Sequence, residues 1–351
     1  MKIWVGVQRI TATLIQVAVF FYLCYDAYQE AIEMKKVMIF VLCVCMLLTL
    51  SACGGGGNTN LVATKPLAVA QENTVEDYAD FTLFKIATSK KITASLAGTL
   101  YFENDKEGET YIDIVLDWTN KSTEGINSAD LLEAFAIGAN GTEYKRCLYA
   151  VETNNASYLS QYEHIAPLST ARLHCAISVP ESEKELTLML KINGEVYACK
   201  YNLGQKISSA QQIQPGQTVG NTDFATMEFL GIEYTDDLLP SNTSGAYSHY
   251  PVKNASNTYL VAKFDITSYL PSAKDCDAFV GVKATYMDKY TYTGFVVVES
   301  DDGKRFSSYD DIDPLTTRHF YCLIEVPKTV TENEVELTIA FNNQEFIYTG
   351  K

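Results

Sequence analysis

The stretch that decides the fold is IAPLSTARLHCAISVP, residues 165–180, because it returns as IDPLTTRHFYCLIEVP at residues 312–327. Ile, Pro, Leu, Thr, Cys, Ile, Val and Pro recur at the same spacing, at an offset of 147 residues. Two further blocks repeat in the same order: TYIDIVLDWTN (110–120) matches TYLVAKFDITS (258–268), and LTLMLKINGEVYAC (186–199) matches VELTIAFNNQEFIY (335–348). Nearly constant offsets over three ordered blocks predict two copies of one domain rather than a solenoid.

All three blocks alternate between apolar side chains and other residues with period two. This period predicts strands with one buried face, and the two copies agree in phase. The predicted buried set of the first copy is Ile112, Ile114, Leu116, Trp118, Leu173, Cys175, Ile177, Val179, Leu186, Leu188, Leu190 and Ile192. The matching set of the second copy is Leu260, Ala262, Phe264, Ile266, Phe320, Cys322, Ile324, Val326, Val335, Leu337, Ile339 and Phe341.

Turn residues complete the pattern. Asn193-Gly194 and Asn342-Asn343 stand at the same place in the two copies, and both pairs tolerate the positive φ of a tight hairpin turn. Further short strands are expected at 80–87, 131–138, 142–150, 226–234, 278–286 and 291–299. About seven short strands per copy, with no sustained helical period, predict an all-β chain of two tandem immunoglobulin-like β-sandwich domains.

The domain boundaries follow from composition. We expect the first sandwich over 77–202 and the second over 223–351. The Gly-, Gln- and Ser-rich composition of 203–222 predicts a linker, and the Gly-rich composition of 53–76 predicts a flexible tether.

The N-terminal region has the pattern of a secretory signal. Lys35 and Lys36 precede an apolar run, 37–50, which is shorter than the ~20 residues that a transmembrane helix needs. Small residues follow, and then Cys53. We expect the signal peptide to span 34–52. Translation then begins at Met34, and residues 1–33 are not part of the translated protein. The alternative is that 1–33 is a real upstream hydrophobic segment.

The sequence Leu50-Ser51-Ala52-Cys53 resembles the lipobox of bacterial lipoproteins. This resemblance implies that the signal is cut before Cys53 and that the Cys53 thiol carries a diacylglycerol. With the tandem strand pattern, the chain resembles Gram-positive lipoproteins with telokin-like or immunoglobulin-like domains. The family resemblance implies a lipid-anchored protein on the extracytoplasmic face of the bacterial membrane. Cys53 is the only functional residue that it carries over.

The charge of the chain argues against some partners. Its net charge of −16 repels phosphate backbones, so we expect no nucleic-acid binding. Attachment to a membrane must then come from the lipid on Cys53.

The sequence predicts no catalytic, cofactor-binding or metal site. His174 alternates to the face opposite Cys175, and His164, His249 and His319 fit no metal or catalytic motif. Cys175 and Cys322 read as buried apolar residues. A Cys276–Cys322 disulfide stays open, as does calcium binding by the acidic stretch 299–313. Its carboxylates are Asp301, Asp302, Asp310, Asp311 and Asp313.

These observations favour a non-enzymatic surface lipoprotein that binds an unknown protein or a cell-wall component. The alternative is an accessory lipoprotein for a glycan or a peptide, with an enzyme as a distant third. An aromatic platform would serve the alternative, and its candidate residues are Tyr286, Tyr290, Tyr292 and the pair of Tyr247 and Tyr250 near His249.

Overall fold

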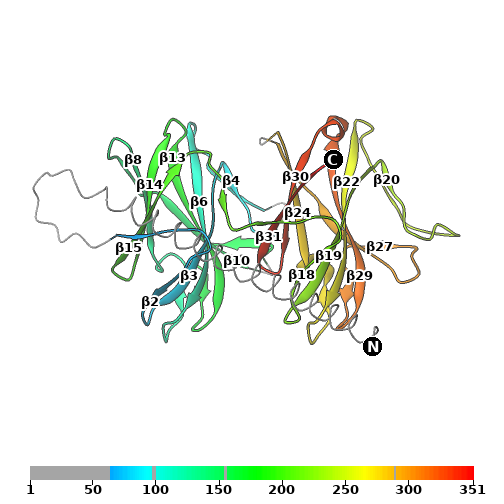
Figure 1. Cartoon of the computed structure of the whole chain (residues 1–351), viewed down its shortest axis with the longest axis horizontal. Helices are drawn as coiled ribbons and strands as arrows, with labels where there is room; N and C mark the ends of the chain where they lie inside the picture. Colours follow the sequence, from blue (N-terminus) through cyan, green and yellow to red (C-terminus); the bar gives the residue numbers. More distant parts are fainter. Residues whose placement is uncertain (1–63, 97–99, 154–155, 288–289) are drawn as a thin grey trace, which may run out of the picture. The chain divides into compact units, whose positions relative to one another are not determined.

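The computed structural model describes residues 64–96, 100–153, 156–287 and 290–351. These residues form two β-sandwiches, one after the other along the chain (Figure 1). Only two short 3-10 segments of the described residues, Cys276–Ala278 and Lys328–Glu332, accompany the strands. The expected all-β tandem fold is therefore confirmed. No helix within these ranges is long and apolar enough to cross a membrane.

The first sandwich pairs a five-stranded with a seven-stranded sheet. The five-stranded sheet has the order β1 (Thr64–Pro66), β15 (Glu195–Asn202), β14 (Glu185–Ile192), β8 (Glu133–Gly138), β9 (Glu143–Tyr144). The other runs β11 (Tyr158–Ser160), β10 (Cys147–Thr153), β13 (Thr170–Pro180), β6 (Glu109–Asn120), β3 (Ala79–Ser89), β16 (Ile207–Ser208), and β2 (Glu72–Val75) also pairs with β3. Two small ladders join β4 (Lys91–Ile92) to β5 (Phe102–Glu103) and β7 (Ile126–Asn127) to β12 (His164–Ile165).

The second sandwich repeats this plan. Its five-stranded sheet has the order β17 (Gln211–Gln212), β31 (Gln344–Gly350), β30 (Val335–Phe341), β24 (Val280–Tyr286), β25 (Tyr290–Thr293). Its six-stranded sheet runs β18 (Gln217–Gly220), β19 (Ala225–Thr235), β22 (Asn257–Ser268), β29 (Thr317–Pro327), β26 (Phe295–Glu299), β27 (Phe306–Ser307). The small ladders join β20 (Asp237–Leu238) to β21 (Tyr250–Pro251) and β23 (Lys274–Asp275) to β28 (Asp311–Ile312).

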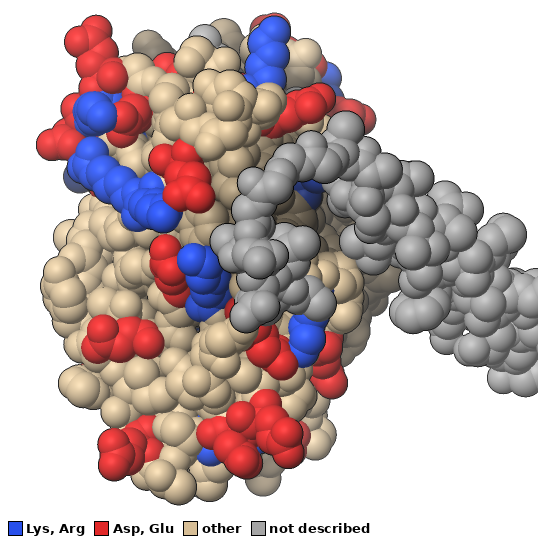
Figure 2. Space-filling view, turned by 90° about the vertical axis from the view of Figure 1, so that its left-hand side faces the viewer, with Lys and Arg blue, Asp and Glu red and all other residues tan. Residues whose placement is uncertain are grey.

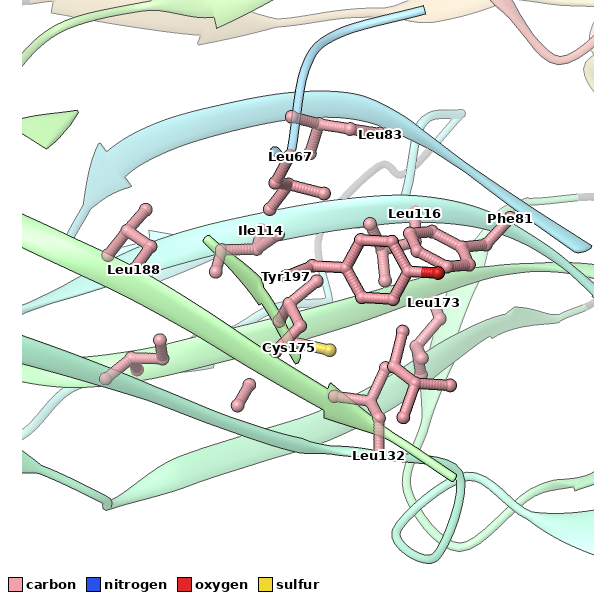
Figure 3. Close-up of a cluster of buried hydrophobic side chains, with 14 of the residues drawn as sticks. Leu67, Phe81, Leu83, Ile114, Leu116, Leu132, Leu173, Cys175, Leu188 and Tyr197 are labelled. Atoms are coloured by element: carbon pink, nitrogen blue, oxygen red, sulfur yellow. The ribbon is translucent and has the colours of Figure 1, made fainter. Parts of the chain in front are cut away.

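Each sandwich has its own core between its two sheets. The predicted buried sets of both copies all lie in these cores. Figure 3 shows part of the first core, where Cys175 lies among Ile114, Leu173 and Tyr197 from both sheets. The alternation of the sequence therefore identified the buried face correctly.

The repeat extends to irregular details. The ladder of β3 with β6 shifts register between Leu83 and Lys85, and that of β19 with β22 shifts between Phe229 and Gly231. The residues inside the two bulges, Phe84 and Leu230, are equivalent at an offset of 146. Both predicted hairpin turns form, with φ of 43° at Asn193 and 50° at Asn342.

The predicted tether and linker are partly wrong. The expected tether contains β1 and β2, and the expected linker 203–222 contains β16, β17 and β18. β1 adds to β15 and β17 adds to β31, both in parallel. Each addition is anchored by one buried residue, Leu67 or Ile213. A two-residue or three-residue edge strand with a single apolar anchor has no detectable period, so composition alone suggested a linker. Residues 53–63 lie outside the described residues.

Two expected strands each divide between the two sheets. The segment 142–150 becomes β9 and β10, and 291–299 becomes β25 and β26. In the second case the chain passes from the five-stranded to the six-stranded sheet at Gly294. A Cβ atom at Gly294 would lie 2.1 Å from the carbonyl oxygen of Leu323. A side chain at this position therefore requires the backbone to move.

We expect Gly294→Ala to lower the free energy of unfolding by about 1–3 kcal/mol, because the added methyl group overpacks the crossing. Urea denaturation measures the change. Gly125→Ala is the matched control, since the nearest atom to its added Cβ is 3.7 Å away. Equal losses in the two variants would contradict the assignment.

Candidate functional site

The sequence-predicted residues divide into those that the structure describes and those that it does not. Cys53, the signal 34–52 and the extension 1–33 lie outside the described residues. Cys175 and Cys322 are buried in the two cores, as predicted. Cys276 and Cys322 are both free thiols, so the disulfide left open by the sequence is not formed. Burial raises the pKa of each of these two thiols to about 12, which leaves them protonated and unreactive.

His174 does lie on the face opposite Cys175, but it is buried rather than exposed. Its Nδ1 is 2.9 Å from Oδ2 of Asp113, and its Nε2 is 3.2 Å from Oε1 of Glu152. Glu152 also accepts hydrogen bonds from the backbone N–H and the hydroxyl of Ser95, both at 2.7 Å. The result is an imidazole held between two buried carboxylates.

The charges of this cluster support one another. Burial opposes a charged imidazole, but the carboxylates of Asp113 and Glu152 outweigh it and raise the pKa of His174 to about 9. Burial likewise opposes ionisation of Glu152, but the hydrogen bond and charge of His174 outweigh it and lower the pKa of Glu152. The imidazole is therefore protonated at neutral pH, and both of its nitrogens are occupied by carboxylates.

Arg172 extends the cluster toward the second sandwich. Its guanidinium donates two hydrogen bonds to Asp117, at 2.8 and 3.1 Å, and lies 3.6 Å from the centre of the Phe84 ring. Its Nη2 also donates to the backbone carbonyl of Asn343, at 2.6 Å. Asn343 is at the tip of the β30–β31 hairpin, so Arg172 binds one sandwich to the other.

Two lysines complete this contact, which we call the junction. Lys85 forms an ion pair with Glu345 at 2.6 Å. Lys283 donates from its Nζ to the hydroxyl of Thr93, at 2.7 Å, and to the carbonyl of Ala94, at 3.1 Å. Burial, and then the nearby charge of Lys85, lower the pKa of Lys283 to about 8.

A hollow of about 610 Å³, the junction hollow, opens beside these contacts. Four of the exposed large apolar or aromatic side chains of the described residues line it: Leu100, Tyr158, Phe295 and Tyr309. Lys283 and Asp277 add an amine and a carboxylate to the lining. Apolar walls with a few polar groups are typical of ligand sites.

The junction hollow was not predicted from the sequence. Tyr158 and Tyr309 flank irregular segments, where no period marks a common face. The predicted aromatic platform is divided between two places. Tyr286, Tyr290 and Tyr292 lie on the β24–β25 hairpin, whereas Tyr250 packs against Phe295 and Phe306.

The acidic stretch does not converge on one point. Asp301 and Asp310 both approach the guanidinium of Arg318, at 3.4 and 3.9 Å, and Asp302 accepts a hydrogen bond from the backbone N–H of Lys304. Among the described residues, no group of three or more His, Cys, Asp or Glu side chains is arranged to hold a metal ion.

The surface charge is mixed. On the face that Figure 2 shows, acidic and basic side chains are interspersed over a largely uncharged surface. This face therefore presents no continuous basic stripe for a phosphate backbone.

The chain was compared with known proteins. No protein-family description and no curated protein matches it. Among solved structures, it is similar to an uncharacterized β-sandwich protein from Clostridium difficile, with 24% sequence identity and a TM-score of 0.39. The match covers 42% of this chain and 98% of that one.

Proposed function

We propose that the protein is a lipid-anchored protein of the extracytoplasmic membrane face, and that it binds a partner without catalysing a reaction. The observation that carries the binding role is the junction hollow with its exposed rim of Leu100, Tyr158, Phe295 and Tyr309. Exposed aromatic side chains around a hollow favour ligand contact, because each buries a large area at low cost in conformational entropy. The lipobox-like sequence ending at Cys53 supports the anchor.

The chemistry of the cluster favours binding over catalysis. A general base needs a free nitrogen or oxygen within reach of the substrate. Both nitrogens of His174 are engaged by carboxylates, and the amine of Lys283 is engaged by Thr93 and Ala94. These groups hold the fold together at the junction.

An extended peptide is the ligand that the hollow fits best. β24 pairs with β25 only over Lys283–Tyr286, so on that side Val280–Val282 have no ladder partner among the described strands. These three residues line the junction hollow. A strand edge offers backbone hydrogen bonds to an added strand, while neighbouring apolar side chains select the side chains of the peptide.

Selection from a random-peptide display library on the full chain in detergent tests this function. We expect enriched peptides to lose affinity by at least tenfold when Tyr309 and Phe295 are both changed to Ser, because aromatic anchors dominate such interfaces. Tyr309 is 85% exposed and Phe295 is 41% exposed, and neither belongs to the two cores between the sheets, although Phe295 also packs against Tyr250.

Tyr162→Ser is the matched control, since Tyr162 is 69% exposed and does not line the hollow. Equal peptide binding by the double variant and by the unchanged chain would refute the assignment. Selection of cell-wall glycan fragments instead of peptides, with the same loss in the double variant, would support the glycan alternative.

A further inference from the structure

The second sandwich has an open hollow at the place where the first sandwich is covered by the junction. This hollow, which we call the terminal hollow, measures about 480 Å³ and is lined in part by Ser241, Glu299, His319 and Tyr321. At offsets of 146 or 147, these four residues are equivalent to Ser95, Glu152, Arg172 and His174. The residues that surround the junction contact in one copy therefore surround a hollow in the other.

The equivalence holds in the contacts as well as in the sequence. The backbone N–H of Ser95 donates to Oε1 of Glu152, and that of Ser241 donates to Oε1 of Glu299 at 2.5 Å. Glu299 is buried, as its equivalent is. Both copies thus retain the same buried carboxylate beneath the same loop.

A second equivalent pair lies across the central strands. Arg172 faces Asp117 between β13 and β6, and His319 faces Asp265 between β29 and β22, with Nδ1 2.5 Å from Oδ1. The shorter imidazole leaves unfilled the space that a guanidinium occupies in the first copy.

The element that covers this place in the first sandwich also exists twice. It is the hairpin tip Asn342-Asn343, whose carbonyl binds Arg172. The equivalent tip of the first sandwich is Asn193-Gly194, which is exposed and also has positive φ. The chain therefore presents an unused tip on one sandwich and an unused receiving face on the other.

The receiving face of the second sandwich is apolar where that of the first is aromatic or polar. Leu230 and Leu239 are 42% and 50% exposed. They are equivalent to Phe84 and Thr93, which lie under the junction. The second sandwich therefore exposes apolar side chains at two positions that the junction covers in the first sandwich.

The Asn193-Gly194 tip also lacks the charged neighbours that the Asn342-Asn343 tip has at the junction. Lys283 and Glu345, which make ionic or polar contacts at the junction, are replaced by Phe135 and Val196 at the equivalent positions of the first sandwich. In a pairing of first-sandwich tip with second-sandwich face, Phe135 takes the place of Lys283 opposite Leu239. The Phe135 ring is 4% exposed beneath Lys145 and Lys191, so Leu239 would contact the lysine side chains that cover it. It likewise brings Val196 toward Gly231, the equivalent of Lys85.

Charge is complementary at the edge of the same pairing. At the junction, Ala340 and Ala156 line one small hollow. Their equivalents are Lys191, which is exposed, and Gly303, which follows the exposed Asp301 and Asp302. Within one chain, Lys191 pairs with Glu133 at 3.1 Å and Asp301 pairs with Arg318 at 3.4 Å. The pairing would add a contact of opposite charge between Lys191 and the acidic turn of a neighbour.

We propose that the terminal hollow receives the Asn193-Gly194 hairpin of a second copy of this chain, so that copies associate head to tail. The contact repeats the junction between molecules, without the Lys85–Glu345 ion pair and without the buried amine of Lys283. Such a heterologous interface leaves one tip and one face free at the ends, so it produces chains of more than two copies. The terminal hollow and the junction hollow share no lining residue, so head-to-tail association does not require the proposed ligand.

Sedimentation equilibrium of the full chain in density-matched detergent tests the proposal. We expect the average mass to rise with protein concentration beyond that of two copies. Lys191→Glu and Asp301→Lys, taken singly, should each weaken association at least tenfold, because each places like charges face to face. The double variant should recover association to within about threefold of the unchanged chain, since the two charges are exchanged.

Lys200→Glu is the matched control, because Lys200 is also an exposed lysine of the first sandwich but lies away from the hairpin tip. It should leave association unchanged. A mass that stays at one copy, or a double variant no better than the single variants, would overturn the proposal.

Discussion

Cys53→Ala should abolish labelling of the protein by a fatty-acid analogue and release it from the membrane fraction. The proposed anchor is the diacylglycerol on the Cys53 thiol, and alanine has no nucleophile to accept it. Acyl chains bind the bilayer by ~0.8 kcal/mol per buried CH₂ group, so loss of two or three chains removes nearly all of the membrane affinity. The acidic remainder of the chain would not restore it by charge.

Cys45→Ala is the matched control for this experiment. Cys45 lies in the apolar run of the signal that is expected to be removed, eight residues before Cys53. It should label as the unchanged chain does. Labelling that persists in Cys53→Ala, or that is lost equally in Cys45→Ala, would disprove the anchor assignment.

His174 should make the stability of the protein depend on pH between about 6.5 and 9. Its pKa is raised from an unfolded value near 6.5 to about 9. A raised pKa contributes stability that is fully present below pH ~6.5 and is lost as the pH rises through about 9. The shift corresponds to about 3 kcal/mol at 1.36 kcal/mol per pH unit.

The measurement compares the unchanged chain with His174→Gln by urea denaturation between pH 6 and pH 10. Glutamine leaves Asp113 and Glu152 without a cation, so the variant should be least stable relative to the unchanged chain at the lower pH values. The difference should shrink by about 3 kcal/mol as the pH passes 9. The pKa of Lys283 is lowered to about 8, so its effect on the free energy of unfolding becomes more favourable as the pH rises. This effect is present in both proteins, so the difference between them cancels most of it.

His249→Gln is the control for this prediction, because His249 also pairs with a carboxylate, that of Asp237, but is 42% exposed. It should leave the pH dependence unchanged. A constant difference between His174→Gln and the unchanged chain from pH 6 to pH 10 would show that His174 is not charged in the folded state.

The sequence could predict the cores because burial there follows a local rule. Leu173, Cys175 and Ile177 are each two residues apart on one strand, and their counterparts 147 residues later keep the phase. The hairpin turns were predictable for the same reason, since Asn193 needs only its neighbours to adopt positive φ. Edge strands such as β17 were not, because a two-residue strand is defined by its partner rather than by its own pattern.

The contacts of the candidate site could not be predicted from neighbouring residues in the sequence. Asp113 stands alone among apolar residues in TYIDIVL, which marks it as unusual, but nothing nearby names His174 as its partner. Arg172 and Asn343 are separated by 171 residues and belong to different copies. The repeat predicts that the two copies have the same fold, whereas the junction depends on the few surface residues by which they differ.

The short connection between β16 and β17 limits how far the two sandwiches can separate on that side. Only Ser209 and Ala210 separate the last residue of β16 from the first residue of β17, and these strands belong to different sandwiches. Three consecutive Cα steps span at most about 11 Å, so the connection has almost no slack. The spacing of the two sandwiches at this connection is therefore fixed unless an edge strand detaches, and we expect a ligand of the junction hollow to be selected by its width.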